Sequence, residues 1–260
     1  MSLPLDDDSS GFRVVDVEGL GPVKATLVSS SFAGIDGEQY QHSKREPRNL
    51  KLKLELDPEA DVGTVYDLRQ HLYEFFMPKS EVSFRLHMLN GLEVDIIARV
   101  ESCEPDIFTR EPVMNISTMC FQPDFIDLLP QVVMGMTTSG ETPIEIDYKG
   151  TVETGIQFVL EVDRSLSGFS VHHVPPDESM VTMDFDNVPL VAGDVLTIST
   201  VPGAKGATLV RDNTTTSVLF GVSPQSKWFE MQRGLNTFLV HAEGAPIPLS
   251  IEYLNRYGGL

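Results

Sequence analysis

Carboxylates are the most numerous residues with chemical potential in this sequence, because 38 of its 260 residues are Asp or Glu. Neighbouring carboxylates can bind a divalent cation or exchange protons with a substrate. The closest groups are Asp6-Asp7-Asp8, Asp57/Glu59/Asp61 and Asp184/Asp186. None of them has the spacing of a calcium-binding loop, and the middle group precedes a predicted helix, whose N-terminus favours negative charge. We therefore predict no metal site.

The histidines and cysteines are also placed unfavourably for metal chemistry. The six histidines are His42, His71, His87, His172, His173 and His241. Adjacent side chains of a strand point to opposite faces, so His172 and His173 cannot bind one ion together, and no His-Glu-x-x-His spacing occurs. Cys103 and Cys120 form no Cys-x-x-Cys motif. We expect two reduced thiols in strands, although a single disulfide is open to them if those strands pair.

The common signatures of catalysis and nucleotide binding are absent as well. The sequence contains no Gly-x-Ser-x-Gly nucleophile elbow, no Gly-x-x-x-x-Gly-Lys-Ser/Thr loop and no Gly-x-Gly-x-x-Gly turn. We therefore predict that the protein is not an enzyme and that it has no catalytic, metal-binding or cofactor-binding residues.

The protein carries a net charge of −19, which both halves of the sequence share. Residues 1–130 hold 12 Lys and Arg against 23 Asp and Glu, a balance of −11, and residues 131–260 hold 7 against 15, a balance of −8. A basic stripe that could grip phosphates is missing, which argues against ordinary nucleic-acid binding. The sequence starts without the basic and apolar regions of a signal peptide, and no run reaches the roughly 18 apolar residues of a membrane span. We expect a protein that is made and folded in the cytosol.

The first half of the sequence predicts a β-sheet with one helix packed on it. Apolar and charged residues alternate in Leu50–Leu56, the period of a half-buried strand. Further strands are predicted at residues 12–18, 24–30, 81–88, 92–100 and 112–121. An apolar stripe predicts a helix over residues 62–76 with Asp61 as N-cap, and Asn90-Gly91 predicts a hairpin. The glycines of Phe32–Gly37 predict an exposed hairpin or arm.

The second half predicts a β-sandwich or jelly roll. Residues 134–143 are rich in Gly, Ser and Thr and predict a linker or a domain entry. Short strands are then predicted at residues 144–148, 155–162, 179–185, 195–201, 207–210, 217–220, 227–231, 237–242 and 249–254. Such regular short strands are typical of sandwiches. Trp228 is expected to pack into the core, with stacking on a sugar as the alternative. We predict a mainly β protein with domains at residues 1–130 and 131–260.

Several short motifs, taken in order, cover nearly the whole sequence. They are Gly34–Gly37, Arg48–Leu54, Phe121-Gln-Pro-Asp124, Asp147–Gly150, Thr154–Phe158, Ala192–Ile198, Trp228–Asn236 and Ile251–Leu260. In their order and spacing they resemble the phage distal tail protein family, the siphovirus-type components that form the hub at the tail tip. Gln122 departs from that pattern, because many members of the family have aspartate before the proline.

The resemblance implies a fold and a function. The fold is an N-terminal β-sheet or split-barrel domain with one helix, followed by a C-terminal galectin-like β-sandwich. The N-terminal domains would form a hexameric ring around a channel that DNA only passes through, and this hub would connect the tail tube to baseplate, tail-tip or fibre proteins. The implied location is the tail tip of the virion after assembly in the host cytoplasm, with no membrane contact and no cofactor. The alternative function is a carbohydrate- or receptor-binding β-sandwich module that contacts the host surface.

Residues 32–46 are the segment that we expect to reach a neighbouring subunit. The candidate interface residues are Phe32, Ile35, Asp36, Lys44, Arg45 and Arg48. Two of them are apolar anchors, and the three basic ones form a local cluster that could pair with acids of the neighbour in a ring closed by rotation. The alternative is a surface hairpin without a partner. The acidity of the chain further suggests negative channel walls along which DNA slides without sticking.

Overall fold

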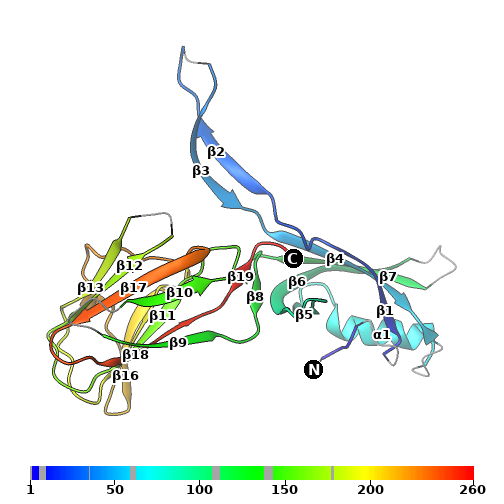
Figure 1. The fold of residues 1–260 in the computed structure, drawn as a ribbon. Helices are drawn as coiled ribbons and strands as arrows, with labels where there is room; N and C mark the ends of the chain where they lie inside the picture. The colour runs from blue at the N-terminus through cyan, green and yellow to red at the C-terminus, as the bar shows by residue number, and fades with distance from the viewer. Residues whose placement is uncertain are drawn as a thin grey trace. The chain divides into compact units, whose positions relative to one another are not determined.

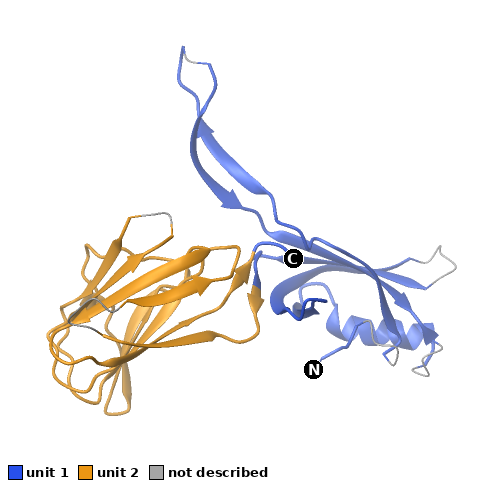
Figure 2. Ribbon diagram, in the orientation of Figure 1, with its two compact units in different colours: residues 1–125, 258–260 blue, residues 126–257 orange. Residues whose placement is uncertain are grey.

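The computed structural model describes residues 2–5, 10–34, 36–58, 63–106, 112–137, 143–176 and 179–260. The chain divides into two compact units, residues 1–125 with 258–260 and residues 126–257 (Figure 2). We call them the N-terminal unit and the C-terminal unit. The predicted mainly β fold is confirmed.

The N-terminal unit is built on a curled antiparallel sheet (Figure 1). In spatial order its strands are β1 (Phe12–Glu18), β4 (Arg48–Leu56), β7 (Val113–Cys120), β6 (Glu93–Asp106) and β5 (Glu81–His87). Every second residue of β4 is buried, as its alternation predicts, and Leu54 is fully enclosed. A connection at Asn90-Gly91 joins β5 to β6, so the predicted hairpin is present.

The single helix, α1 (Val65–Phe75), covers one face of this sheet with Leu68 and Leu72. It starts later than the sequence predicts. The N-cap is Thr64, whose hydroxyl oxygen accepts a hydrogen bond from the Asp67 amide, while the Asp67 carboxylate accepts one from the Thr64 amide. The prediction of Asp61 as N-cap is therefore wrong, and Asp61 itself lies outside the described residues.

A separate two-stranded ribbon belongs to the N-terminal unit. Its strands are β2 (Ala25–Ser30) and β3 (Gln39–Arg45), which pair only with each other in the described structure (Figure 1). We call residues 25–45 the arm. Nearly every described residue of the two strands is exposed, so the ribbon contributes nothing to the core. The predicted exposed hairpin is present here.

The C-terminal unit is a sandwich of two antiparallel sheets. One has the order β10 (Ile144–Tyr148), β17 (Gly234–Ala242), β12 (Phe169–Val174) and β13 (Val181–Phe185). The other has the order β16 (Thr214–Ser217), β15 (Gly206–Arg211), β14 (Val195–Ser199), β11 (Ile156–Glu161), β18 (Pro248–Tyr253) and β9 (Gln131–Met136). Inward residues of both sheets form one core, in which Phe158, Phe229 and Phe238 make edge contacts. Trp228 packs against this core, as predicted.

Three short elements complete the described fold. They are β8 (Phe125–Asp127), β19 (Arg256–Tyr257) and the 3-10 turn Leu219–Gly221. The Asp127 amide donates a hydrogen bond to the Asn255 carbonyl, and the Asp127 carboxylate accepts one from the Asn255 side chain. Both ends of the C-terminal unit are therefore joined to each other.

The structure corrects the sequence analysis at four places in this unit. The predicted linker at 134–143 begins inside β9, where Gly135 faces inward and a Cβ would lie 2.2 Å from the Ile144 Cδ1 atom. The prediction lacks β12, because the buried His173 breaks the apolar alternation there. Residues 227–231 alternate like a strand, but within this segment only Met231 forms a β-bridge, with Thr154. The strand expected at 217–220 is a 3-10 turn after β16.

Candidate assembly surface and its anchor

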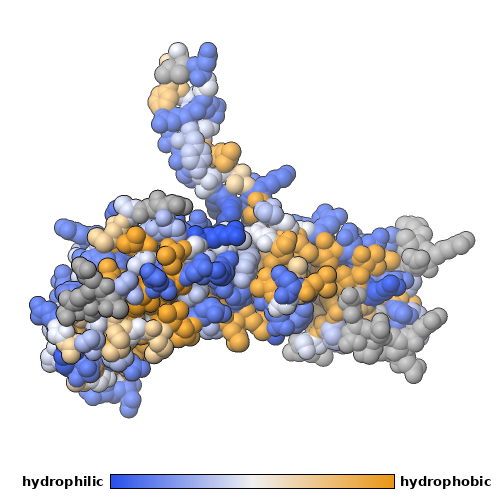
Figure 3. Space-filling view, viewed as in Figure 1, coloured by the Kyte–Doolittle hydropathy of each residue, from blue (hydrophilic) through white to orange (hydrophobic). Residues whose placement is uncertain are grey.

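The arm presents large apolar side chains to solvent. Leu27 lies on the same face as Tyr40, because the cross-strand pairs Leu27–Ser43 and Ser29–Tyr40 place them on alternate positions of one face. Leu27 is 69% exposed, Tyr40 60% and Phe32, near the tip, 54%. Figure 3 shows such hydrophobic residues at the surface of the arm, among hydrophilic ones. A two-stranded ribbon with no core is marginal by itself in water, so the arm has a surface suited to a partner.

The base of the arm is fixed by an ion pair. Arg45, the last residue of β3, donates two hydrogen bonds to the Asp124 carboxylate, one of them 3.1 Å from Nη2 to Oδ2. The Asp124 side chain is 1% exposed, whereas that of Arg45 is 40% exposed. The two strands are also joined below the ribbon by a 2.9 Å hydrogen bond from the Glu46 amide to the Lys24 carbonyl. The arm therefore starts from an ordered base.

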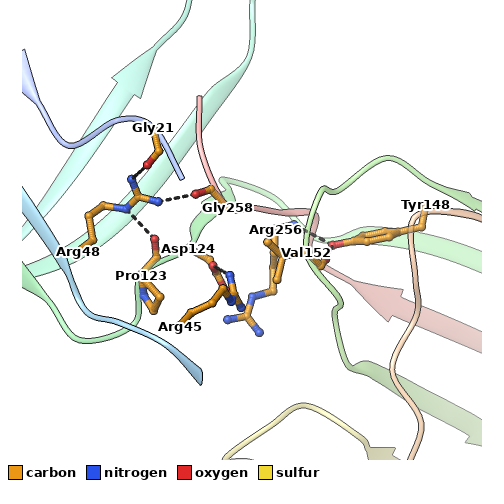
Figure 4. A network of polar contacts seen from close by, with 9 residues as sticks. All are labelled: Gly21, Arg45, Arg48, Pro123, Asp124, Tyr148, Val152, Arg256 and Gly258. Carbon is orange, nitrogen blue, oxygen red and sulfur yellow. Dashed lines mark hydrogen bonds and ion pairs between the residues drawn. The ribbon is translucent and has the colours of Figure 1, made fainter. Parts of the chain in front are cut away.

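Arg48 forms the centre of this base, and it is buried rather than exposed. Its guanidinium donates to four backbone carbonyls, those of Gly19, Gly21, Pro123 and Gly258, three of which are drawn in Figure 4. The distances to the last three carbonyls are 2.6, 2.7 and 2.7 Å. An arginine suits this position because its planar fork holds five donors in fixed directions.

The charge of Arg48 is held away from water, because the residue is only 1% exposed. Its Cζ atom lies 4.4 Å from the ring centre of Phe125, a cation–π contact. Burial lowers the pKa of Arg48, and the nearby Cys120 and Asp124 act in the opposite direction. The charged form is thus stabilised by four carbonyl dipoles and one aromatic face rather than by water.

Two glycines allow the backbone to approach this arginine closely. Gly19 has a φ of +94°, and a Cβ there would lie 2.1 Å from the Asn49 carbonyl oxygen. At Gly259 a Cβ would meet the Pro22 nitrogen at 2.7 Å. The Leu260 amide donates a 3.0 Å hydrogen bond to the Leu20 carbonyl beside them. Residues 258–260 are therefore an integral part of the base of the arm.

The structure separates the six predicted interface residues. Phe32, Asp36 and Lys44 are exposed on the arm, Arg45 is half-exposed at its base, and Ile35 lies outside the described residues. The prediction of Arg48 as an interface residue is wrong, because its side chain is enclosed by four carbonyls of its own chain and is not available to a neighbour. Asp124 was not predicted, although the Phe121-Gln-Pro-Asp124 motif contains it together with the Pro123 carbonyl.

The motifs of the C-terminal unit also have structural roles. The buried Asn236 donates from Nδ2 to the Gln232 and Gly234 carbonyls, and its Oδ1 lies 3.0 Å from the Nε2 atom of His173. The His173 ring stacks on Phe238, with the two ring centres 4.5 Å apart. Asn236 therefore holds the turn at Gln232–Gly234 in place and links it to β12 through His173.

An ion pair between the buried Asp194 and the partly exposed Arg211 supports the turn before β14. The Asp194 carboxylate accepts hydrogen bonds from Arg211, 2.7 Å from Nε and 2.6 Å from Nη2, and another from the Val191 amide at 2.8 Å. The hydrogen bonds from Arg211 lower the pKa of Asp194, while burial opposes them. The Ala192-Gly-Asp194 motif is therefore a buried structural corner.

Within the described ranges, no group of three or more His, Cys, Asp or Glu residues is placed to hold a metal ion. The two cysteines are free thiols, Cys120 buried and Cys103 half-buried. Across the part of the chain that the structure describes, no helix has the length and apolar character to cross a membrane.

Comparison with known proteins gives one sequence family and several structures. Residues 149–257 match the family described as siphovirus-type tail component, C-terminal domain. No curated protein sequence matches the chain. The fold is similar to that of the Dit protein (gp 19.1) of phage SPP1, with a TM-score of 0.69 and 15% identity over 96% of this chain and 95% of that one. That protein is described as a paradigm of the hub adsorption apparatus in phages that infect Gram-positive bacteria.

A second similar structure is a chain of the phage P2 baseplate in its activated conformation with calcium. The TM-score is 0.52 and the identity 10%, over 96% of this chain and 92% of that one. At such identities a structural match shows the fold. The sequence match to the siphovirus-type tail component family thus covers residues 149–257, and the structural matches extend the similarity in fold to 96% of this chain.

Proposed function

We propose that this protein is a structural component of the hub at the distal end of a phage tail, where copies of it form a hexameric ring that connects the tail tube to baseplate or fibre proteins. The observation that carries the proposal is the shared fold over 96% of this chain and 95% of the Dit protein of phage SPP1. Both units take part in that match, so the likeness extends beyond the family-matched domain.

The arm supports assembly as the function of this fold. It exposes Leu27, Phe32 and Tyr40 without contributing to its own core, and a buried network fixes its base. An exposed apolar ribbon on a rigid base gains free energy by docking on a neighbour, because less ordering entropy is lost than with a free loop. The same contact repeated around an axis is heterologous and closes into a ring.

Electrostatics favour the same arrangement. Lys44 lies exposed on the arm, while the chain as a whole carries −19. Within residues 25–45, Lys44 and Arg45 balance Asp36 and Glu38, so the arm has no net charge and meets less repulsion from an acidic copy than the rest of the chain does. We expect salt to favour assembly, because it screens the repulsion between copies.

DNA would pass through the channel of such a ring without specific contacts. We place the protein in the virion, at the tail tip, after assembly in the host cytoplasm, with tail-tube, tail-tip or fibre proteins as its partners. The negative charge of the chain suits a wall that DNA does not adhere to. A measured affinity of the purified ring for duplex DNA in the micromolar range at physiological salt would contradict this part of the proposal.

The experiment that tests assembly compares the full chain with a variant whose arm is shortened. Residues 26–44 are replaced by Asn-Gly, which joins Ala25 to its cross-strand partner Arg45 in a two-residue turn and keeps the base of the arm intact. Native mass spectrometry and light scattering should show hexamers for the full chain and monomers for the variant. Equal oligomers in both would refute the role of the arm.

The alternative, a carbohydrate- or receptor-binding module, stays a prediction. Trp228, the candidate for sugar stacking, packs against the hydrophobic core of the sandwich. A glycan-array screen of the full chain tests the alternative directly: a monomer that binds glycans supports it, and a ring that binds none supports the hub.

A further inference from the structure

Most edge strands of the described structure carry features that prevent pairing with another chain. Such features are charged side chains, bulges, short length or a covering segment. Charged residues lie on β1, β5 and β10, for example Arg13, Arg85 and Glu145. On the arm, β3 carries Lys44 and Arg45 and contains the extra residue of a bulge between Val28 and Ser29 of its partner strand.

The remaining protected edges lie in the C-terminal unit. A following segment covers β13, where the Ser223 amide donates to the Asp184 carbonyl at 2.8 Å and the Lys227 amide to the Thr182 carbonyl at 3.1 Å. β16 is only four residues long and follows a tight turn, in which Asp212 and Asn213 both have positive φ. Neither edge offers a long open row of backbone groups.

Two edge strands have no such protection, and they match each other. β2 (Ala25–Ser30) and β9 (Gln131–Met136) each have six residues, and neither contains a charged residue or a proline. In the described structure β2 pairs only with β3, and β9 only with β18, so each has one open edge. Charged residues make up 22% of the sequence, which makes two uncharged open edges notable.

The side chains of β2 and β9 also suit pairing with another strand. On β9, Val132, Met134 and Met136 share the outward face and are 52%, 70% and 49% exposed. On the same face of the sheet, Met134 is followed across the neighbouring strands by Ser250 of β18 and Val159 of β11, which carry no charge. On β2, Leu27 is 69% exposed. Methionine side chains adapt their shape to a partner, so this stripe can accept an added apolar strand.

We propose that β2 of one copy pairs with the open edge of β9 in another copy, which adds the two strands of the arm to the six-stranded sheet. Leu27 then continues the outward stripe of Met134. The inference rests on the proposed assembly through the arm and names the surface that receives it. Main-chain hydrogen bonds would supply much of the affinity, and the matched apolar stripes the register. The contact is heterologous, as a closed ring requires.

Cysteine cross-linking between two singly substituted chains tests this contact. One full chain carries Leu27→Cys and the other Met134→Cys, so a product that contains both can only form between copies. A short bismaleimide should give a mixed dimer in the mixture. The matched control pairs Leu27→Cys with Met180→Cys, at a methionine of the same unit that is 56% exposed. No mixed dimer, or as much with Met180→Cys, overturns the proposal.

A charge-swap experiment tests the same contact without a cross-linker. Met134→Lys should weaken self-association at least tenfold, because it places a charge in an apolar stripe, and Met180→Lys should leave it unchanged. Leu27→Glu combined with Met134→Lys should restore most of the association, by pairing the two charges. Sedimentation velocity measures all four proteins. No effect of Met134→Lys, or no rescue in the double variant, contradicts the pairing.

The outcomes separate this contact from the proposed function. Loss of hexamers on shortening the arm, together with an unaffected Met134→Lys protein, leaves the hub proposal standing and places the arm elsewhere on the neighbour. Hexamers that form equally well without the arm, together with no cross-link, refute both the role of the arm and its docking site.

Discussion

Arg45 and Asp124 form an ion pair across 79 residues of sequence, between the last residue of the arm and the motif that ends the N-terminal sheet. The pair joins a half-exposed guanidinium to a buried carboxylate. The pair supports the arm at its base, where support matters because the two exposed strands of the arm share no core of their own.

Removing one partner of this pair should be worse than removing both. Arg45→Ala removes the guanidinium that is hydrogen-bonded to the buried Asp124 carboxylate, which should lower the free energy of unfolding by about 2 kcal/mol, less than for a fully buried pair because Arg45 is partly solvated. Adding Asp124→Asn should recover part of the loss. Urea denaturation of the wild-type protein, both single variants and the double variant measures the coupling, and additive losses would show that the pair contributes nothing.

Arg48 should tolerate no replacement, including lysine. Lysine has three donors on one nitrogen and cannot reach carbonyls from three different segments, so Arg48→Lys should cost about 3 kcal/mol and Arg48→Ala slightly more. Both variants should also show faster hydrogen exchange at the Leu260 amide, which donates a hydrogen bond to the Leu20 carbonyl beside the arginine. The control is Arg13→Lys, at an exposed arginine, where exchange should not change.

The two thiols should be unreactive in the folded protein. Burial raises the pKa of both Cys103 and Cys120 to about 11. At pH 8 only about 0.1% of each is then the reactive thiolate, compared with roughly a quarter for a free cysteine. Ellman's reagent should label both slowly in buffer and rapidly in guanidinium chloride. Fast labelling of one thiol in buffer would contradict the burial of that residue.

The stability of the C-terminal unit should fall in acid partly through Asp194. Arg211 lowers the pKa of this carboxyl in the folded state, so its stabilisation is complete above the unfolded pKa near 4 and is lost as the pH falls through the lower, folded value. Asp194→Asn should therefore reduce the melting temperature at pH 7 and flatten its decline as the pH falls below about 4. Asp163→Asn, at an exposed pair, is the control; equal effects of both substitutions would exclude a special role for Asp194.

The sequence predicts those elements whose periodicity follows from their own burial. β4 alternates because one face meets α1 and the core, and Leu54 marks that face without ambiguity. The sequence does not predict β12, because the polar His173 occupies an inward position of that strand. The His173 ring is hydrogen-bonded to Asn236, which lies 63 residues further along the chain. Pattern reasoning cannot anticipate a buried polar side chain whose partner lies on another strand.

In the candidate site, too, the sequence pattern did not predict the surroundings of individual residues. Lys44, Arg45 and Arg48 form one basic cluster in the sequence, yet they have three different environments: solvent, a half-buried ion pair and a cage of carbonyls. The cage is made by Gly19, Gly21, Pro123 and Gly258, whose side chains carry no signal. The apolar interface candidate Phe32 is exposed because it lies near a turn without a core, as the glycines around it predicted.

The bond from Arg48 to Gly258 also sets an order of events during synthesis. Its acceptor follows the arginine by 210 residues. At typical rates of translation that interval is on the order of 10–40 seconds. Until then the strands of the N-terminal unit can pair, but the guanidinium lacks one of its carbonyls, and the base of the arm stays incomplete. The base of the arm is therefore complete only after the last residues of the C-terminal unit have emerged from the ribosome.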